Sequence, residues 1–486
     1  GYEHLKTLLT KVAQEAFPPH MPEFTGDPAV MKRIRRLPQG SSSFRSINSW
    51  KPEGNLVAHF TEHTASINQL AISWDNLLFA SCSDDGSVKI WDCSRLERNV
   101  TNRSRVTYNR QGGRIKCLTF IQQTYSIAAA SDNGSIHVFR VDMRNAGSAL
   151  KFGKCVPVRK HQLNQEYAIT IKHFTSDASN TMAGSKSILL LATNKGNIYA
   201  LDLLTMETLW KLKNPISYGV ITSIVTDRLH TWMLVGTTRG FLTLYDLRFQ
   251  ILLRSWLHYS GSRINYMLLS HDPKAEGKHV IIAAGTNEVS VWDIVQLCCV
   301  EVFSVKLGED MPKAINDIHT DHYKALEAPS EDDLLDEPEI INEAHFAENS
   351  IQAVVSPSDC RFIITGGSDR KLRFWDIARA ESSSVLLGLD SDEPKPRYIT
   401  AVHDQIKFHF EYPYSQRNSS STSSMHMGDS SGSHRGHYQS PKETNFTQQQ
   451  HLLRNHTDAI TDVILTEVPY PMIISGDRDG VIKVVS

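Results

Sequence analysis

The chain has 486 residues, of which 40% are hydrophobic and 21% are charged, and its formal net charge at pH 7 is −2. This length is enough to bury a substantial core, and the composition is typical of a globular protein. The near balance of charge excludes the broad positive field with which proteins bind nucleic acid or anionic membranes electrostatically.

The seven cysteines are a poor disulfide framework, because their number is odd and two of them are adjacent, at 298 and 299. They favour a reducing, cytosolic compartment. No run of about 18 apolar residues occurs, so no transmembrane helix is predicted. The chain begins Gly-Tyr-Glu-His, without an initiator Met or an apolar signal segment, and this favours a fragment or a processed chain.

Residues 1–53 are predicted to form a helical leader and linker. Glu3–Ala16 has the spacing of an amphipathic helix, with one apolar face made of Leu5, Leu8, Leu9, Val12 and Ala13. A single helix cannot bury such a face alone, so we expect it to pack on the remainder of this chain or on an upstream domain. The residues that follow it are expected to be an extended linker, because they contain Pro18, Pro19, Pro22 and Pro38.

From residue 54 onward the chain repeats one unit of strands and turns. Ser81–Asp92 reads S-C-S-D-D-G-S-V-K-I-W-D, and Thr365–Asp376 reads T-G-G-S-D-R-K-L-R-F-W-D. In the first stretch the alternation before Asp92 predicts a strand. The preceding Asp-Asp-Gly predicts a turn, because Gly tolerates positive φ and Asp bonds its own backbone. Two more apolar runs, Ile67–Ile72 and Leu77–Ala80, complete a unit of three strands.

The unit occurs seven times in the chain. The strand that ends each unit is read at 87–92, 135–139, 197–202, 241–246, 288–293, 371–376 and 481–485. Repeats of about 40–45 residues with four strands and a terminal Trp-Asp are typical of WD-repeat β-propellers, and the chain resembles that family over residues 54–486. The fold class implied is all-β, a seven-bladed propeller with a short helical leader. Because unit seven ends at its third strand, the unassigned stretch Asn55–Phe60 is predicted to supply the missing outer strand and close the ring.

The resemblance implies a structural hydrogen-bonded tetrad that recurs in several blades. The matching residues are His63, Ser81, Asp85 and Trp91 in unit one; Thr365, Asp369 and Trp375 in unit six; and His456, Ser475 and Asp479 in unit seven, where Val485 replaces the Trp. A catalytic Ser-His-Asp triad is the alternative reading of these residue types. We favour the structural role, because an active site occurs once whereas this set repeats, and such a network satisfies buried polar groups.

Two insertions interrupt the units. Residues 304–350 contain the acidic stretch 327–343 with the apolar pairs Leu334-Leu335 and Ile340-Ile341, which is either a solvated loop or a segment that docks on a basic partner. Residues 415–450 are rich in Ser, His and Gln and are predicted to be disordered, with Ser440-Pro441 a possible phosphorylation site. The strand-like stretch 398–414 is expected to cover part of blade six.

The sequence predicts no catalytic site, cofactor or metal. Phosphate-loop, zinc-protease and nucleophile-elbow motifs are absent. Two polar sets with metal-ligand side chains are interpreted as loop residues: His319, Asp321 and His322, and His426, His434 and His437. Thr238-Arg239-Gly240 is interpreted as a blade turn, since the Arg-Arg-Gly motif of phosphoinositide-binding propellers is missing.

The leader indicates which kind of WD-repeat protein the chain resembles. Residues 3–19, E-H-L-K-T-L-L-T-K-V-A-Q-E-A-F-P-P, and 50–63, W-K-P-E-G-N-L-V-A-H-F-T-E-H, are similar to the C-terminal region of the regulatory subunit of class III phosphatidylinositol 3-kinase. The resemblance implies a non-catalytic scaffold that helps to assemble the lipid kinase for autophagy and endosomal sorting. The implied partners are the catalytic subunit and coiled-coil subunits, with a Rab-family GTPase as a further candidate. It also implies a cytoplasmic location, peripheral on endosomal or autophagic membranes through the rest of the complex. The contact residues are not predicted.

Two alternatives remain at this stage. One is the substrate-recognition propeller of a ubiquitin ligase, for which an adaptor helix or a basic binding face would be the sign. The other is a phosphoinositide-binding propeller, against which the missing motif argues. In either case the blades would present loops from a rigid scaffold.

Overall fold

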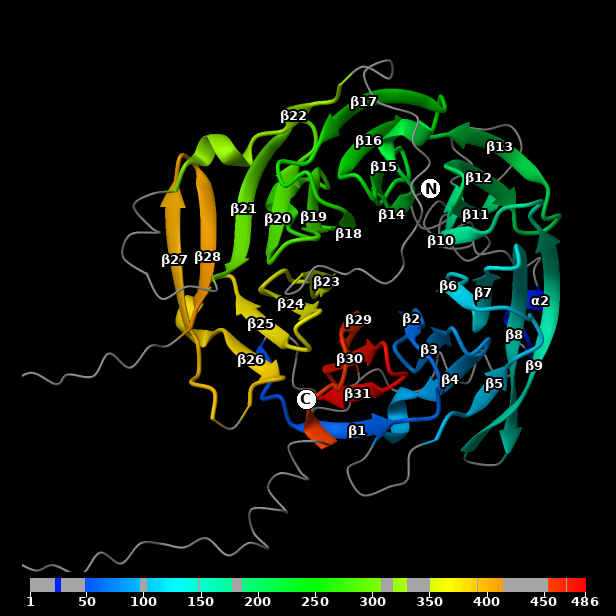
Figure 1. Cartoon of the computed structure of the whole chain (residues 1–486). Coiled ribbons are helices and arrows are strands. Elements are labelled where there is room, and N and C mark those ends of the chain that lie inside the picture. Colours follow the sequence, from blue (N-terminus) through cyan, green and yellow to red (C-terminus); the bar gives the residue numbers. More distant parts are fainter. Residues whose placement is uncertain are drawn as a thin grey trace, which may run out of the picture.

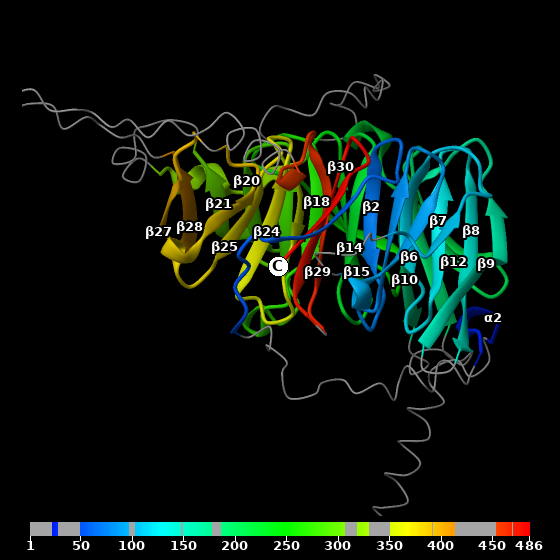
Figure 2. The ribbon, with the colours of Figure 1, turned by 90° about the horizontal axis from the view of Figure 1, so that it is seen from below.

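The computed structural model shows a closed ring of seven sheets, the blades of a propeller (Figure 1). The predicted all-β, seven-bladed fold is confirmed. Figure 2 shows the ring from the side, with the blades standing next to one another. The structure describes residues 22–27, 49–96, 103–146, 149–176, 186–306, 318–329, 350–390, 392–413, 453–468 and 470–486.

Blades one to three each have four strands, and the first strand of each lies nearest the centre of the ring (Figure 1). Blade one contains β2 (Ile67–Ile72), β3 (Leu78–Ser83), β4 (Val88–Asp92) and β5 (Val106–Tyr108). Blade two contains β6 (Ile115–Phe120), β7 (Ser126–Ser131), β8 (Ser135–Ala146) and β9 (Ala149–Gln162). Blade three contains β10 (Ala168–Ser176), β11 (Lys186–Thr193), β12 (Asn197–Asp202) and β13 (Thr208–Lys213).

Blades four and five carry extra strands at their outer edges. Blade four contains β14 (Ile221–Thr226), β15 (Trp232–Thr237), β16 (Phe241–Asp246), β17 (Ile251–Leu257) and β22 (Leu326–Glu327). Blade five contains β18 (Ile264–Leu269), β19 (His279–Ala284), β20 (Glu288–Asp293), β21 (Cys298–Val305), β28 (Ile406–Tyr412) and β27 (Arg397–His403).

Blades six and seven complete the ring. Blade six contains β23 (Ile351–Val355), β24 (Phe362–Gly367), β25 (Leu372–Asp376) and β26 (Ser384–Leu387). Blade seven contains β29 (Ile460–Thr466), β30 (Met472–Asp477), β31 (Ile482–Val485) and β1 (Leu56–Phe60).

The ring is closed by pairing β1 with β31. The pairing is antiparallel, with Ala58 opposite Val484 and Phe60 opposite Ile482. This is the closure that the sequence predicted, and it gives blade seven its fourth strand. Phe60 then packs on the side chains of blade one, with its ring centroid 4.3 Å from that of Trp91.

The second strands of the blades read as continuous apolar or small runs because both of their faces are covered. β3 and β7 are buried along their whole length, between neighbouring blades. The turn that follows β3 requires glycine at position 86, where φ is +82° and an added Cβ would lie 2.9 Å from the carbonyl oxygen of Gly113.

A register shift occurs near the start of all seven first strands, between residues such as Ile67 and Gln69 or Ile460 and Asp462. The shift places a polar side chain against the next blade. Thr461 Oγ1 donates to the carbonyl oxygen of Ile67 at 2.6 Å. Three other first strands make the equivalent bond: Asn68 to Ile115, Thr222 to Ile264 and Asn265 to Ile351. The blades are therefore held together by directional hydrogen bonds as well as by apolar packing.

In three of these strands, the residue after the donor accepts a hydrogen bond from a backbone N–H of the next blade. Asp462 Oδ2 accepts the N–H of Leu70 at 2.8 Å, and Gln69 and Ser223 accept in the same way from the following blade. Asp462 is only 3% exposed. Burial raises the pKa of this carboxyl to about 7, against the opposing effect of its backbone hydrogen bonds.

The described parts of the leader, residues 22–27 and 49–53, both contact the propeller. Residues 22–25 form the short helix α2 (Pro22–Thr25), so Pro22 begins a helical turn and is not part of an extended linker as predicted. The reason is that proline suits the first helical position, where no N–H is needed. The Phe24 side chain is fully buried, and Ser126 Oγ donates to its carbonyl oxygen at 2.6 Å. Trp50 packs on Phe362 of blade six.

The stretch 398–414 was expected to cover part of blade six, and most of it forms the β27–β28 hairpin. Its backbone joins blade five, since β28 pairs with β21 in parallel (Figure 1). Its side chains nevertheless contact blade six, where the ring of Tyr398 meets Trp375 edge-on at 5.5 Å. A segment far along the chain therefore bridges two blades.

The predicted domain boundaries remain predictions where the structure does not describe the chain. β21 continues to Val305, so the first two residues of the predicted insertion 304–350 belong to a strand. Residues 318–329 of this insertion contain β22, which pairs with blade four. The predicted helix Glu3–Ala16, most of the acidic stretch and all of 415–450 lie outside the described residues.

We expect Phe60→Ala to lower the free energy of unfolding by about 3–5 kcal/mol, because it leaves a cavity between the closing strand and blade one. Chemical denaturation followed by tryptophan fluorescence measures the change. Val402→Ala is the matched control, since this side chain is 67% exposed. Equal effects of the two substitutions would contradict a structural role for the β1 contact.

The closing seam also contains a titratable pair. Lys483 Nζ donates to His59 Nδ1 at 2.8 Å and also to the carbonyl oxygen of Leu453. Burial and the adjacent Lys483 lower the pKa of His59 from 6.5 to about 4, and burial lowers the pKa of Lys483 to about 8.

We expect the propeller to lose stability as the pH falls from 6.5 towards 4, because the unfolded chain then binds a proton on His59 more tightly than the folded one. The half-exposed position of the ring reduces the effect to on the order of 1 kcal/mol. His59→Gln keeps an acceptor for Lys483 but does not titrate. Denaturation at pH 7 and pH 5 should therefore show a smaller loss in this variant, and an equal loss in both proteins would exclude His59 as the cause.

Candidate functional site

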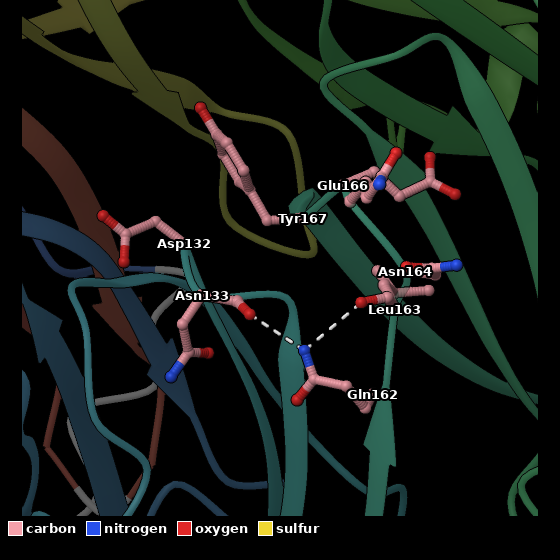
Figure 3. Close-up of a pocket in the computed structure, with 8 residues that line it drawn as sticks. Asp132, Asn133, Gln162, Leu163, Asn164, Glu166 and Tyr167 are labelled. Atoms are coloured by element: carbon pink, nitrogen blue, oxygen red, sulfur yellow. Dashed lines mark hydrogen bonds between the residues drawn. The ribbon is translucent and has the colours of Figure 1, made fainter.

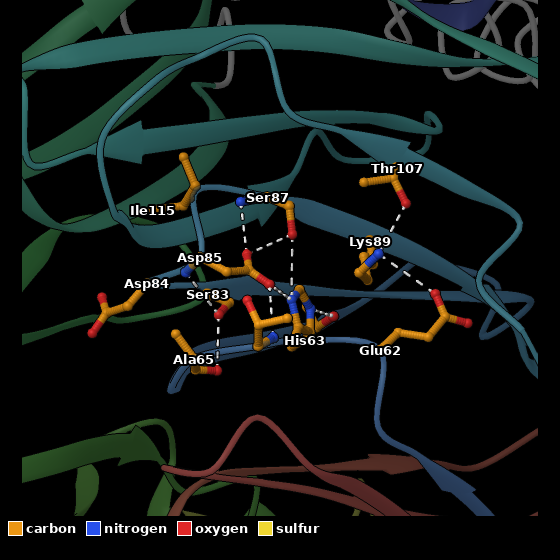
Figure 4. Close-up of polar contacts among 12 residues, drawn as sticks. Glu62, His63, Ala65, Ser83, Asp84, Asp85, Ser87, Lys89, Thr107 and Ile115 are labelled. Carbon is orange, nitrogen blue, oxygen red and sulfur yellow. Dashed lines mark hydrogen bonds and ion pairs between the residues drawn. The ribbon is translucent and has the colours of Figure 1, made fainter.

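The tetrad of blade one is a continuous hydrogen-bonded chain. Figure 4 shows its His63 and Asp85 side chains together with Ser87. His63, in the loop before β2, lies 2.8 Å from Asp85 Oδ2 through Nδ1 and 2.7 Å from Ser81 Oγ through Nε2. Trp91 Nε1 donates to the same Ser81 oxygen at 3.0 Å. A neutral imidazole that donates to Asp85 and accepts from Ser81 satisfies every group in the chain.

Asp85 receives further hydrogen bonds from Ser87, through its Oγ at 2.6 Å and its N–H at 2.9 Å. Burial by itself would raise the pKa of the Asp85 carboxyl. The hydrogen bonds from His63 and Ser87 outweigh burial and hold this pKa well below its usual range. The charge of Asp85 is thus used to hold the His63 ring in place. His63, Ser81 and Trp91 are at most 4% exposed.

Blade seven corrects one predicted residue. His456 Nδ1 lies 2.7 Å from Asp477 Oδ2, and its Nε2 lies 2.7 Å from Ser475 Oγ. Asp479, which we predicted as the partner, instead accepts from Thr457 Oγ1 at 2.6 Å. The reason is that Asp477 ends β30 two residues nearer to Ser475, so its carboxylate reaches the imidazole first. In blade one the acid lies four residues after the serine, at Asp85. In blade seven an acid already stands two residues after the serine, at Asp477, and it takes this role.

Blade six uses an arginine where blades one and seven use a histidine. Trp375 Nε1 donates to Thr365 Oγ1 at 3.0 Å, as in the tetrad. Asp369, however, lies 2.7 Å from Arg373 Nη2, and Arg373 Nε lies 2.9 Å from Glu411 on the β27–β28 hairpin. Burial opposes the charge on Arg373, but the two carboxylates prevail and raise its pKa. This buried cluster fixes the hairpin to blade six.

Sequence reasoning missed a related network in blade five. His258 Nε2 lies 3.1 Å from Ser290 Oγ, which also accepts from Trp292 Nε1 at 2.9 Å. The serine here is on the third strand, two residues before the tryptophan, whereas in blade one it is on the second strand. Trp292-Asp293 was the available signal, but no Gly turn precedes it. Burial lowers the pKa of His258 to about 3, so the ring is neutral at physiological pH.

A polar pocket of about 510 Å³ lies between blades two and three (Figure 3). It is lined by the β7–β8 turn at Asp132 and Asn133 and by the loop 162–167. Glu166 in this loop accepts from Thr193, Asn197 and Tyr199 at 2.5–2.8 Å. Its carboxylate is therefore already used in holding the loop to blade three.

The other predicted polar sets are loops where they can be described. His319, Asp321 and His322 lie at the start of a 3-10 turn, and His426, His434 and His437 lie outside the described residues. Within the described ranges no three His, Cys, Asp or Glu side chains are placed to share a metal ion. Arg239 lies in the β15–β16 turn and donates to the carbonyl oxygen of Ser217 at 2.6 Å. No helix in the described part is long and apolar enough to cross a membrane.

The family described as WD domain, G-beta repeat matches residues 54–92, which include β1 to β4, and residues 338–376, which include β23 to β25. Relatives named VPS15 match over 52–90% of the chain. The probable serine/threonine-protein kinase vps15 of Dictyostelium discoideum is 28% identical over 534 residues, covering 90% of this chain and 26% of that protein.

The serine/threonine-protein kinase VPS15 of Arabidopsis thaliana is 29% identical over 360 residues, covering 70% of this chain and 23% of that protein. The putative VPS15 kinase of Komagataella pastoris is 27% identical, covering 90% of this chain and 31% of that protein. The resemblance to the WD-repeat region of the regulatory subunit of class III phosphatidylinositol 3-kinase is confirmed. The chain spans about a quarter of the length of these relatives.

The assignment of Asp477 as the partner of His456 can be tested by substitution. We expect Asp477→Ala to destabilise the propeller by about 1–3 kcal/mol, because the buried His456 ring then loses its acceptor. Asp479→Ala should lower the free energy of unfolding by no more than about 0.5 kcal/mol, since the hydrogen bond between Asp479 and Thr457 is exposed. Urea denaturation of the two variants measures both values. A larger loss for Asp479→Ala would restore the assignment made from the sequence.

Proposed function

We propose that the chain is a non-catalytic protein-interaction scaffold, the propeller of a regulatory subunit that helps to assemble the class III phosphatidylinositol 3-kinase complex for autophagy and endosomal sorting. The observation that carries this proposal is the similarity to vps15 over 90% of the chain. The closed propeller supports it, because a rigid ring presents loops at both ends for partners to bind.

The proposed partners are the catalytic lipid kinase subunit and the coiled-coil subunits, with a Rab-family GTPase as a further candidate. The proposed location is cytoplasmic, on endosomal or autophagic membranes through the rest of the complex. The relatives are named as kinases, but this chain covers 23–31% of their length and is folded as a propeller. Any kinase activity is assigned to the remainder of such a protein.

The repeated polar networks agree with a scaffold. In blades one, five and seven the histidine is buried, and its ring nitrogens are hydrogen-bonded within the network. A general base must reach a substrate proton, and these rings cannot do so without unfolding of the blade. We therefore assign the networks to stability.

The proposal predicts that the chain binds the catalytic and coiled-coil subunits directly. Amide hydrogen exchange of the purified chain, recorded with and without these subunits at concentrations on the order of 10 µM, should show protection confined to loops or blade edges. Direct docking buries a limited patch and leaves the central strands unchanged, and this gives the expected pattern.

An unrelated seven-bladed propeller mixed with the same subunits is the control. No protection of the folded chain, or equal protection of the control, would count against direct docking. The ubiquitin-ligase alternative would then be the next to test.

A further inference from the structure

Among the described strands, the outer edge of blade four carries a continuous run of exposed apolar side chains. Strand β17 has four consecutive exposed residues, Ile251–Arg254, and three of them are large and apolar. Ile251, Leu252 and Leu253 are 47–51% exposed. Two more exposed apolar side chains lie in the turns at the same end of the blade, Leu229 at 78% and Phe249 at 69%. We call these five residues the apolar edge.

The hydrogen-bonding groups on the outer side of this strand are only partly used. β22 pairs with β17 at Trp256 and Leu257 and nowhere else (Figure 1). Pro329 follows β22 two residues later and has no N–H to extend the ladder. Among the described residues, Ile251–Ser255 therefore has no strand on its outer side.

Several other outer strands carry features that disfavour strand addition. β5 has three residues and β26 has four, so both are too short to act as templates. β13 is longer, but Lys211 and Lys213 are exposed on it. The outer strands of blades two, seven and five are β9, β1 and β27. β9 carries three lysines, β1 has no exposed side chain, and β27 exposes one large apolar side chain, Val402. β17 has seven residues, no lysine and three consecutive exposed apolar side chains.

The charges around the apolar edge are basic. Arg254 is exposed on β17 itself and makes no ion pair among the described residues. Arg228 and Arg248 are exposed in the two adjoining turns. Of these, Arg248 is already paired with Asp246 at 2.6 Å, and Arg228 contacts His271. Arg254 thus remains available for an incoming carboxylate.

We propose that β17 at Ile251–Ser255 is a docking site for an extended segment of a partner protein that alternates apolar and acidic residues. The segment adds a strand to blade four, its apolar side chains cover one face of the edge, and a carboxylate faces Arg254. Main-chain hydrogen bonds supply affinity in such strand addition, and the side chains supply specificity. The inference rests on the proposed scaffold function, but its test needs no subunit of the kinase complex.

The test uses a fluorescein-labelled peptide, EIEIEIE, with the whole chain, and fluorescence anisotropy measures binding. The charge-reversed peptide KIKIKIK is the matched control for apolarity and strand propensity. We expect the acidic peptide to bind at least about tenfold more tightly than the basic one. Hydrogen exchange should show new protection at Ile251–Ser255.

Arg254→Glu should weaken the binding of EIEIEIE by about tenfold or more and should strengthen the binding of KIKIKIK. This reciprocal change separates charge recognition from loss of folding. Lys213→Glu makes the same charge change on β13 of the neighbouring blade and should leave both affinities unchanged. Leu253→Asp should abolish binding of EIEIEIE.

Equal binding of the two peptides, or protection on another edge, would overturn the proposal. Binding that appears only after deletion of residues 330–343 would also overturn it, because the chain's own acidic segment would then be the occupant. A concentration-dependent dimer that Leu253→Asp disrupts would assign the edge to a second copy. Failure here leaves assembly with the kinase subunits untouched, since that assembly is measured separately.

Discussion

Antiparallel pairing of β1 with β31 is the constraint on which the ring depends. Without it, blade seven would have three strands, and the apolar faces of Phe60 and its neighbours would be exposed. Blades seven and one are also held together near the centre of the ring. There Thr461 donates to the carbonyl oxygen of Ile67, and the N–H of Leu70 donates to Asp462. The two ends of the propeller sequence therefore meet both at the outer rim and near the axis, and the fold is complete only when both contacts form.

The polar networks show one structural problem solved in several ways. Each buried Trp N–H of blades one, five and six donates to a hydroxyl, but the remaining members of the network vary. Blade one adds an imidazole and Asp85, blade five an imidazole, and blade six a guanidinium between two carboxylates. Blade seven, which lacks the Trp, pairs an imidazole with Asp477. A buried polar group must find a partner, whereas the identity of that partner is free to change. This freedom explains why exact motif spacing failed at Asp479.

Insertions in this propeller act as parts of the blades. The β27–β28 hairpin extends blade five in parallel and brings Glu411 to Arg373 of blade six. The short strand β22 covers one end of β17, and no other described strand pairs with the remainder of its outer side. Both segments come from stretches between repeats. Among the described residues, they determine which outer strands of blades four and five are covered.

The sequence by itself determined the seven repeats, the closing strand and the polar residues of blade one, because strand alternation and Asp-Gly turns are local signals. It also carried the family resemblance, since the leader and the repeats are written in consecutive residues. The tertiary structure decided the partner of His456, the network around His258, the attachment of the hairpin to blade five and the open edge of β17. Each of these depends on which side chains meet across blades or which edge remains uncovered, and such contacts between distant residues leave no periodic signal in the chain.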